Sequence, residues 1–223
     1  MDDEAKQEGG SRLVAVFGTF GDICWLNVLW LLTSIPIFTI GASTTAIYTV
    51  MLKIIDKKEG KITKSYFDAF KSNFKQATIE WLIVLAILVG IGGEFYFAYA
   101  LEYTGAVATF YVGLVIVELI VLALTLPFLF PLTAKFENSV WNMFKNSFLL
   151  AISNPLSWVK VFLAWFMPFF ICICYPVVFY LFWYLWLICI IGFIVFGTSY
   201  TVRKVLRKVD TAQEEKEEEV KEA

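Results

Sequence analysis

The stretch NVLWLLTSIPIFTIGASTTAIYTVMLKII, residues 27–55, decides the fold of this chain. Its apolar run is long enough to enter a lipid bilayer, but Pro36, Gly41 and the small residues 42–46 interrupt it. Proline removes a backbone donor and clashes with the preceding turn, whereas glycine permits a sharp reversal of the chain. We therefore expect a broken membrane hairpin. Gly41 would have a positive φ in its turn, and Ser43 or a neighbouring threonine would cap the second arm.

The composition around this stretch is that of an integral membrane protein. Of 223 residues, 59% are hydrophobic and only 17% are charged, and the mean hydropathy is +0.72. A soluble domain of this size could not bury so much apolar surface. The basic residues form clusters between apolar runs and the net charge is -2, which argues against a nucleic-acid partner. The lipid bilayer is the expected partner.

The apolar runs predict an all-α, polytopic bundle of about six spans, arranged as three hairpins in one transmembrane domain, residues 12–208. The expected spans cover residues 13–38, 42–55, 77–100, 106–132, 156–179 and 185–202. The second span has about 14 residues, or about 21 Å, which is short for a bilayer. A five-span alternative, in which this arm lies flat at the membrane interface and the N-terminus is external, therefore stays open. Acidic, polar tails (1–11 and 209–223) flank the domain.

Two amphipathic segments between the spans are expected to be elbow helices that lie in the headgroup plane. In the first elbow, residues 65–74, aromatic side chains fall on one helical face and charged ones on the other. The second elbow, within residues 135–154, repeats the first: FKSNF with Ala77 is matched by FKNSF with Ala151. Pro155 ends it. The aromatic residues assigned to the two elbows are Phe67, Phe70, Phe74, Trp141, Phe144 and Phe148.

The distribution of lysine and arginine predicts the orientation. A lysine-rich loop between Lys53 and Lys75, and the basic cluster from Arg203 to Lys208, are placed in the cytoplasm by the positive-inside rule. The links at residues 102–105 and 180–184 carry no lysine or arginine and are therefore expected outside. Both termini would be cytoplasmic, with the protein in the plasma membrane of a bacterium.

The hairpin and the first elbow together resemble the YesL family of bacterial integral membrane proteins. The resemblance rests on Asn27, Trp30, the turn motif of Pro36, Thr39, Gly41, Ala42 and Ser43, then Ala46 and Tyr48, and the elbow phenylalanines. Members of that family have no established biochemical activity and are often encoded beside carbohydrate uptake systems. The resemblance thus implies a role linked to sugar import.

Candidate polar sites within the spans are Glu118, Asn27 and Glu94. Glu118 is the strongest, because it lies near the middle of the fourth span, where a charge costs about 3 kcal/mol unless it faces a partner or water. It could be a proton or cation site or an acceptor for a hydroxyl-rich ligand, or a protonated structural glutamate. Glu80, at the cytoplasmic entrance of the third span, is expected to be hydrated.

No catalytic constellation is present in the sequence. The chain has no histidine, no Gly-rich phosphate loop and no nucleophile elbow, and its four cysteines lie in apolar runs without metal-ligand spacing. We expect no enzyme, cofactor or metal site. Two functions remain: an accessory or assembly factor associated with a carbohydrate permease, or a small carrier or channel that uses the broken hairpin 36–46 and Glu118. The sequence leaves the oligomeric state open.

Overall fold

The computed structural model describes the backbone of residues 2–58, 60–101 and 104–222, and their side chains except at 2–16, 186–187, 212–213 and 215–222. The described chain is helical and contains no strand, so the all-α prediction is confirmed. Its α-helices are α1 (Asp2–Ser34), α2 (Ile40–Ile55), α3 (Ile62–Ala100), α4 (Gly105–Thr133), α5 (Val140–Ser153), α6 (Pro155–Cys174), α7 (Pro176–Leu185) and α8 (Ile191–Glu222). A 3-10 turn, η1 (Ile37–Thr39), precedes α2, and a π-helix, η2 (Trp186–Ile190), precedes α8.

Five segments are long and apolar enough to cross a membrane: Ile37–Ile55, Ile62–Ala100, Gly105–Thr133, Pro155–Cys174 and Ile188–Thr211. The protein is therefore a multi-pass membrane protein of the expected class. The short arm of the hairpin is among the five, and its length is compensated by burial, because every residue from Gly41 to Tyr48 is buried by surrounding helices. The first expected span, 13–38, extends four residues beyond the end of α1 at Ser34 and into the turn. The side chains of its first residues, 13–16, lie outside the described part of the chain.

The broken hairpin is present, but its turn is made differently from the prediction. Helix α1 ends at Ser34, as expected for a chain that approaches Pro36, and the 3-10 turn reverses its direction. The Thr39 hydroxyl donates to the carbonyl oxygens of Thr33 (2.5 Å) and Pro36 (2.6 Å) and so closes the turn.

Gly41 does not occupy the turn, and its predicted positive φ is wrong. It lies in the first turn of α2, and Gly105 is the glycine with a positive φ in the described chain. A Cβ at position 41 would come within 2.6 Å of the Trp81 Cβ, so glycine is required there for close packing of α2 on α3. The predicted cap is also wrong, because Ser43 donates to the Thr39 carbonyl within the helix and no side chain caps α2.

Helix α2 forms the centre of the bundle. It packs against α1, α3, α4 and α8, and its most buried side chains include Tyr48 and Met51. The Tyr48 hydroxyl shares a hydrogen bond with Thr198 (3.0 Å), which joins α2 to α8. The second arm of the broken hairpin, α2, therefore lies in the core of the molecule.

The first elbow is not a separate helix. Residues 65–74 continue without a break into the third span as one helix of 39 residues, because no proline or glycine separates them. The second elbow is a separate helix, α5, as expected: Ser139 accepts from the Asn142 N–H at its start, and Asn154 and Pro155 end it. Ala77 and Ala151 are both buried, so the two copies of the motif agree at this position, whereas Phe74 is exposed and its counterpart Phe148 is partly buried.

The turn of the last hairpin also differs from the prediction. Helix α6 ends at Cys174, and α7 begins at Pro176, so the chain reverses at Tyr175. Residues 180–184, expected to form the external link, lie within α7 and η2 follows directly. The expected fifth span, 156–179, runs through Pro176, whereas Pro176 occupies the first position of a new helix, where its missing N–H is not required.

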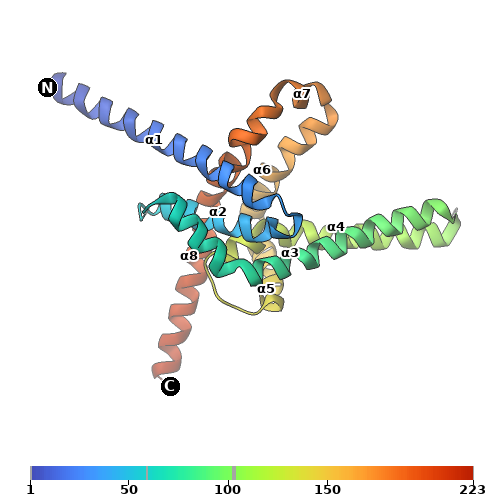
Figure 1. Ribbon diagram of the computed structural model, residues 1–223. Helices are drawn as coiled ribbons and strands as arrows, with labels where there is room; N and C mark the ends of the chain where they lie inside the picture. The colour runs from blue at the N-terminus through green and yellow to red at the C-terminus, as the bar shows by residue number, and fades with distance from the viewer. Residues whose placement is uncertain (1, 59, 102–103, 223) are drawn as a thin grey trace.

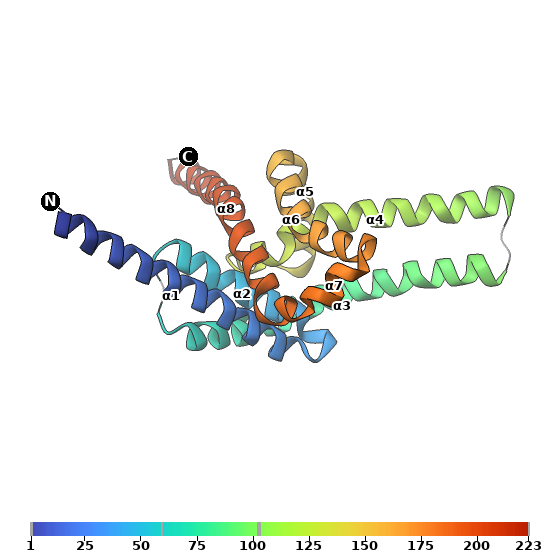
Figure 2. The same cartoon turned by 90° about the horizontal axis from the view of Figure 1, so that it is seen from above.

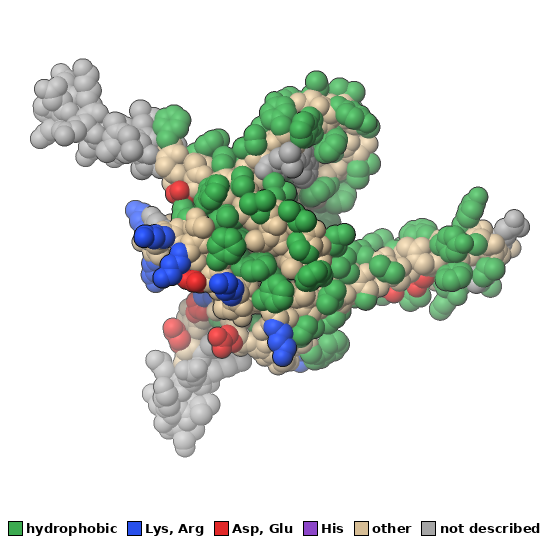
Figure 3. Space-filling model, viewed as in Figure 1, with side chains coloured by type: hydrophobic (Ala, Val, Ile, Leu, Met, Phe, Trp, Pro, Cys, Tyr) green, Lys and Arg blue, Asp and Glu red, His purple; other side chains and the backbone are tan. Residues whose placement is uncertain are grey.

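Two hairpins extend from the central body (Figures 1 and 2). The longer is formed by the end of α3 and the beginning of α4, which run side by side to a tip that no other helix reaches. The shorter is formed by α6 and α7. Basic side chains gather on the side of the body away from the α3–α4 tip, at the left and below in Figure 3, while the surface of the hairpin is largely hydrophobic.

Candidate functional site

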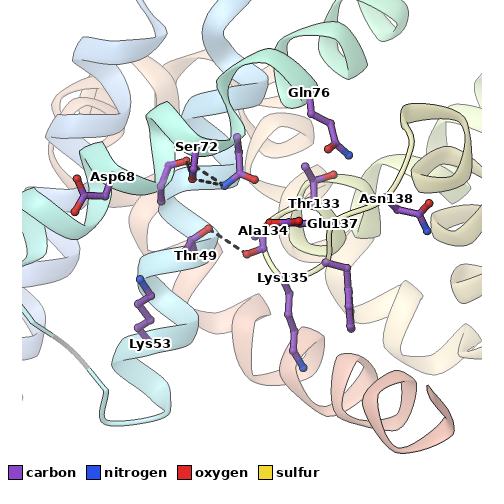
Figure 4. A pocket seen from close by; sticks show the side chains of 13 residues that line it. Thr49, Lys53, Asp68, Ser72, Gln76, Thr133, Ala134, Lys135, Glu137 and Asn138 are labelled. Carbon is purple, nitrogen blue, oxygen red and sulfur yellow. Dashed lines mark hydrogen bonds between the residues drawn. The ribbon is translucent and has the colours of Figure 1, made fainter. Parts of the chain in front are cut away.

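A polar pocket lies where α2, the first half of α3, the end of α4 and the loop after α4 meet (Figure 4). Its volume is about 540 Å³, within the range of about 300–1,000 Å³ that is usual for small-molecule sites. The lining includes cationic Lys53 and Lys135, anionic Asp68 and Glu137, and the amide of Gln76. Charged side chains of both signs therefore line the pocket.

A buried carboxylate lies directly behind this lining. Glu80 of α3 is fully buried, and its two carboxylate oxygens accept hydrogen bonds from Gln76 Nε2 (3.0 Å) and Thr133 Oγ1 (2.8 Å). Both donors line the pocket. The prediction that Glu80 is hydrated is therefore wrong, because the end of α4 covers it. Its charge is not matched by a salt bridge among the described residues, and a proton or a cation would neutralise it.

Ion pairs beside the pocket fix α8 against the ends of α2 and α4. Asp56, just after α2, pairs with Arg203 and Arg207 of α8, and Lys135 pairs with Asp210. Thr49 of α2 also donates to the carbonyl oxygen of Ala134, just after α4 (3.4 Å). These contacts join the ends of α2, α4 and α8 around one side of the pocket, so its shape depends on all three helices.

Glu118 and Glu94, two of the predicted site residues, do not line this pocket. They lie on the two arms of the α3–α4 hairpin, close enough to interact electrostatically. One carboxylate oxygen of each is buried and has no hydrogen-bond partner within the described part of the chain. Glu94 and Glu118 were predicted as separate candidates, and the structure places them on the two arms of one hairpin.

Asn27, the third predicted residue, has a structural position. It is fully buried, and its Oδ1 accepts a hydrogen bond from the backbone N–H of Gly192 (2.9 Å), just after the π-helix. A π-helical segment shifts the backbone hydrogen-bonding pattern, and a side chain can then satisfy a displaced donor. Asn27 therefore joins α1 to the start of α8.

The turn motif and the elbow residues also lie outside the pocket. Thr39, Gly41, Ala42 and Ser43 are buried in helix packing, and Pro36 is exposed. On the elbows, Phe70, Phe144 and Phe148 are partly buried, whereas Phe67, Phe74 and Trp141 are exposed. An exposed aromatic stripe is consistent with the expected contact between elbows and headgroups.

The hydrogen bonds of Glu80 with Gln76 and Thr133 were not predicted from the sequence. Gln76 and Glu80 are four residues apart, so they lie on one face of α3, and this spacing was the available indication. Thr133 is 53 residues away from Glu80 and could not be connected from the sequence. Within the described residues there is no group of three or more histidine, cysteine, aspartate or glutamate side chains that could hold a metal ion.

Comparison with known proteins gives one match. A family model described as "Protein of unknown function, DUF624" matches residues 23–95, which run from α1 through most of α3. This region contains the hairpin turn, the first elbow and Glu80, but neither Thr133 nor Glu118. No curated protein and no solved structure matches the chain.

Proposed function

We propose that this protein is a non-enzymatic accessory or assembly factor of the bacterial plasma membrane, and that its α3–α4 hairpin docks onto a carbohydrate permease. The hairpin carries the proposal. It leaves the body as an isolated pair of helices (Figure 2), and large apolar side chains point outward along both arms. Val89 is 73% exposed and Phe110 is 67% exposed.

The two glutamates of the hairpin favour a protein partner over lipid alone. An ionisable side chain within a membrane is costly unless it pairs with a polar group or reaches water. Glu94 and Glu118 are on this hairpin, and each has a buried oxygen without a partner in the described chain. A polar group on a partner helix packed beside this pair would lower the cost of the two carboxylates in the membrane.

The assignment to carbohydrate uptake is supported by the resemblance of the hairpin and first elbow to the YesL family. The orientation follows from the basic residues, which place the loop after α2 and the end of α8 in the cytoplasm and leave both termini there. The polar pocket would then open near the cytoplasmic surface.

Affinity purification from native membranes tests this proposal. We expect the wild-type protein to retain a carbohydrate permease subunit in fixed stoichiometry. A Gly113→Trp variant should lose that subunit, because position 113 is on the outer part of α4 and nothing lies within 4 Å of a Cβ there. The matched control is Gly18→Trp on α1, which also has free space around it and should keep the partner. Equal recovery with both variants, or no permease with the wild type, would contradict the proposal.

A small carrier or channel is the second candidate, favoured by the polar pocket and by buried Glu80. In that case the ligand would bind beside Gln76 and Thr133, which line the polar pocket, whereas the buried hairpin residues 41–46 are not part of its lining. Purified protein in liposomes distinguishes the two functions. Uptake of a sugar by the protein alone, abolished by Glu80→Gln, would favour the carrier, and absence of uptake with retained permease binding favours the accessory factor.

A further inference from the structure

A second cavity, separate from the polar pocket, lies between α1, α2, α3, α4, α6 and the start of α8. It has a volume of about 440 Å³ and is lined mainly by aromatic and aliphatic side chains. Three tryptophans, Trp30, Trp81 and Trp165, form part of its wall. Phe162 and Phe166 of α6 add to the wall as part of a row of stacked rings, with centroids 5.5 Å apart.

The polar atoms of this wall already have partners. Trp30 Nε1 donates to Thr44 Oγ1 (3.1 Å), Trp81 Nε1 to the Ile37 carbonyl (2.7 Å) and Trp165 Nε1 to the Tyr48 hydroxyl (3.0 Å). The Tyr48 hydroxyl bonds in turn to Thr198. A polar ligand such as a sugar would find no free indole N–H and would lose its own hydrogen bonds to water. The wall therefore suits an apolar ligand.

The position of the cavity identifies its occupant. It lies among helices that are apolar enough to span a membrane, and Phe166 and Phe169 beside it are exposed on the outer face of α6. In a bilayer that face meets lipid, and lipid hydrocarbon is the apolar molecule in contact with it. We propose that this cavity binds the hydrocarbon chain of a membrane lipid, inserted between α4 and α6 and enclosed by the three tryptophans. This site is independent of the permease contact.

The test uses the full-length protein in detergent and a fatty acid that carries a photoreactive diazirine in its chain. After irradiation and peptide mapping, we expect saturable labelling of the segments around Ala123 in α4 and Trp165 in α6. An excess of unlabelled palmitate should reduce it at least tenfold. Labelling that rises without saturation and spreads over the outer surface of the α3–α4 hairpin would overturn the proposal.

A cavity-filling variant provides the second arm of the test. Ala123 lines the cavity, and Ala123→Phe should reduce saturable labelling at least tenfold. Ala86→Phe, at an exposed position on α3 outside the cavity, is the matched control and should label like the wild type. Should Ala123→Phe fail to fold, Leu126→Trp fills the same space. Undiminished labelling in a folded filling variant contradicts the proposal.

Discussion

Gly41 and Gly192 show how single residues set the helix crossings of this protein. A Cβ at position 192 would come within 2.7 Å of the Ile23 carbonyl oxygen, and one at position 41 would press on the backbone of α3. Each position therefore brings two helices together: α2 and α3 at Gly41, and α1 and α8 at Gly192. Small residues at membrane helix contacts allow this close approach.

Gly41→Ala should destabilise the protein by about 1–3 kcal/mol, the usual cost of adding a methyl group to a tightly packed core. Gly113→Ala is the control, because a Cβ there meets nothing within 4 Å and alanine favours the helix by about 0.5–1 kcal/mol. Thermal unfolding in detergent measures both variants. If Gly41→Ala and Gly113→Ala unfold at the same temperature, the α2–α3 contact does not depend on glycine.

Glu80 provides a second prediction at this scale. Glu80→Gln keeps a side chain of the same size and one of the two acceptor oxygens, so it should retain one of the two hydrogen bonds from Gln76 and Thr133. Glu80→Leu removes the acceptor of both donors and should destabilise the protein by about 1–3 kcal/mol, since Thr133 is buried. Chemical or thermal unfolding ranks the variants. A leucine variant more stable than the glutamine variant would mean that the network does not stabilise the fold.

At the scale of elements, helix boundaries were predictable wherever a local residue enforces them. The prediction of the fourth span, 106–132, agrees with α4 to within a residue at each end, and Pro155 ends the second elbow as expected. The first elbow was wrongly separated from the third span, because amphipathic and apolar segments follow each other there without a helix-breaking residue. The reversal at Tyr175 was missed because a proline can either bend a helix or start one.

Because the first elbow is part of α3 and not a separate helix, packing is expected to hold it in place. Tyr66 is fully buried, and its hydroxyl bonds to Thr33 of α1 (2.7 Å), so packing in the core fixes this segment. Replacing Lys64, Lys71 and Lys75 with glutamine should leave its hydrogen exchange unchanged. Tyr66→Phe should increase exchange, because a hydrogen bond worth about 1 kcal/mol is lost. Faster exchange in the lysine variant alone would instead indicate that anionic headgroups anchor the segment.

At the scale of the whole molecule, the fold class follows from the sequence, whereas the site does not. Apolar runs and prolines are local properties, so a helical membrane bundle could be predicted. The polar pocket depends on contacts between α2, α3 and α4, such as Thr133 with Glu80, and these are distant in sequence. Glu118 was singled out for its depth in the span, but its proximity to Glu94 depends on the pairing of two arms.

Orientation in the membrane is predicted by the basic residues and can be measured directly. In a cysteine-free background, single cysteines would replace Ala5, Lys61, Thr104, Asn138 and Tyr175 and be labelled from outside intact cells. Only positions 104 and 175 should react, since the other three lie on the side expected to be cytoplasmic. Reaction at position 5 would place the N-terminus outside and contradict this topology.

Photocrosslinking in living cells tests whether the α3–α4 hairpin is the surface that meets a permease. A benzophenone amino acid is placed at Val89 or Phe110 on the hairpin, with exposed Trp141 on α5 as the control. We expect both hairpin positions to form an adduct with a carbohydrate permease subunit and the control position to form none. Adducts with lipid alone at Val89 and Phe110, or the same protein adduct from Trp141, would contradict it.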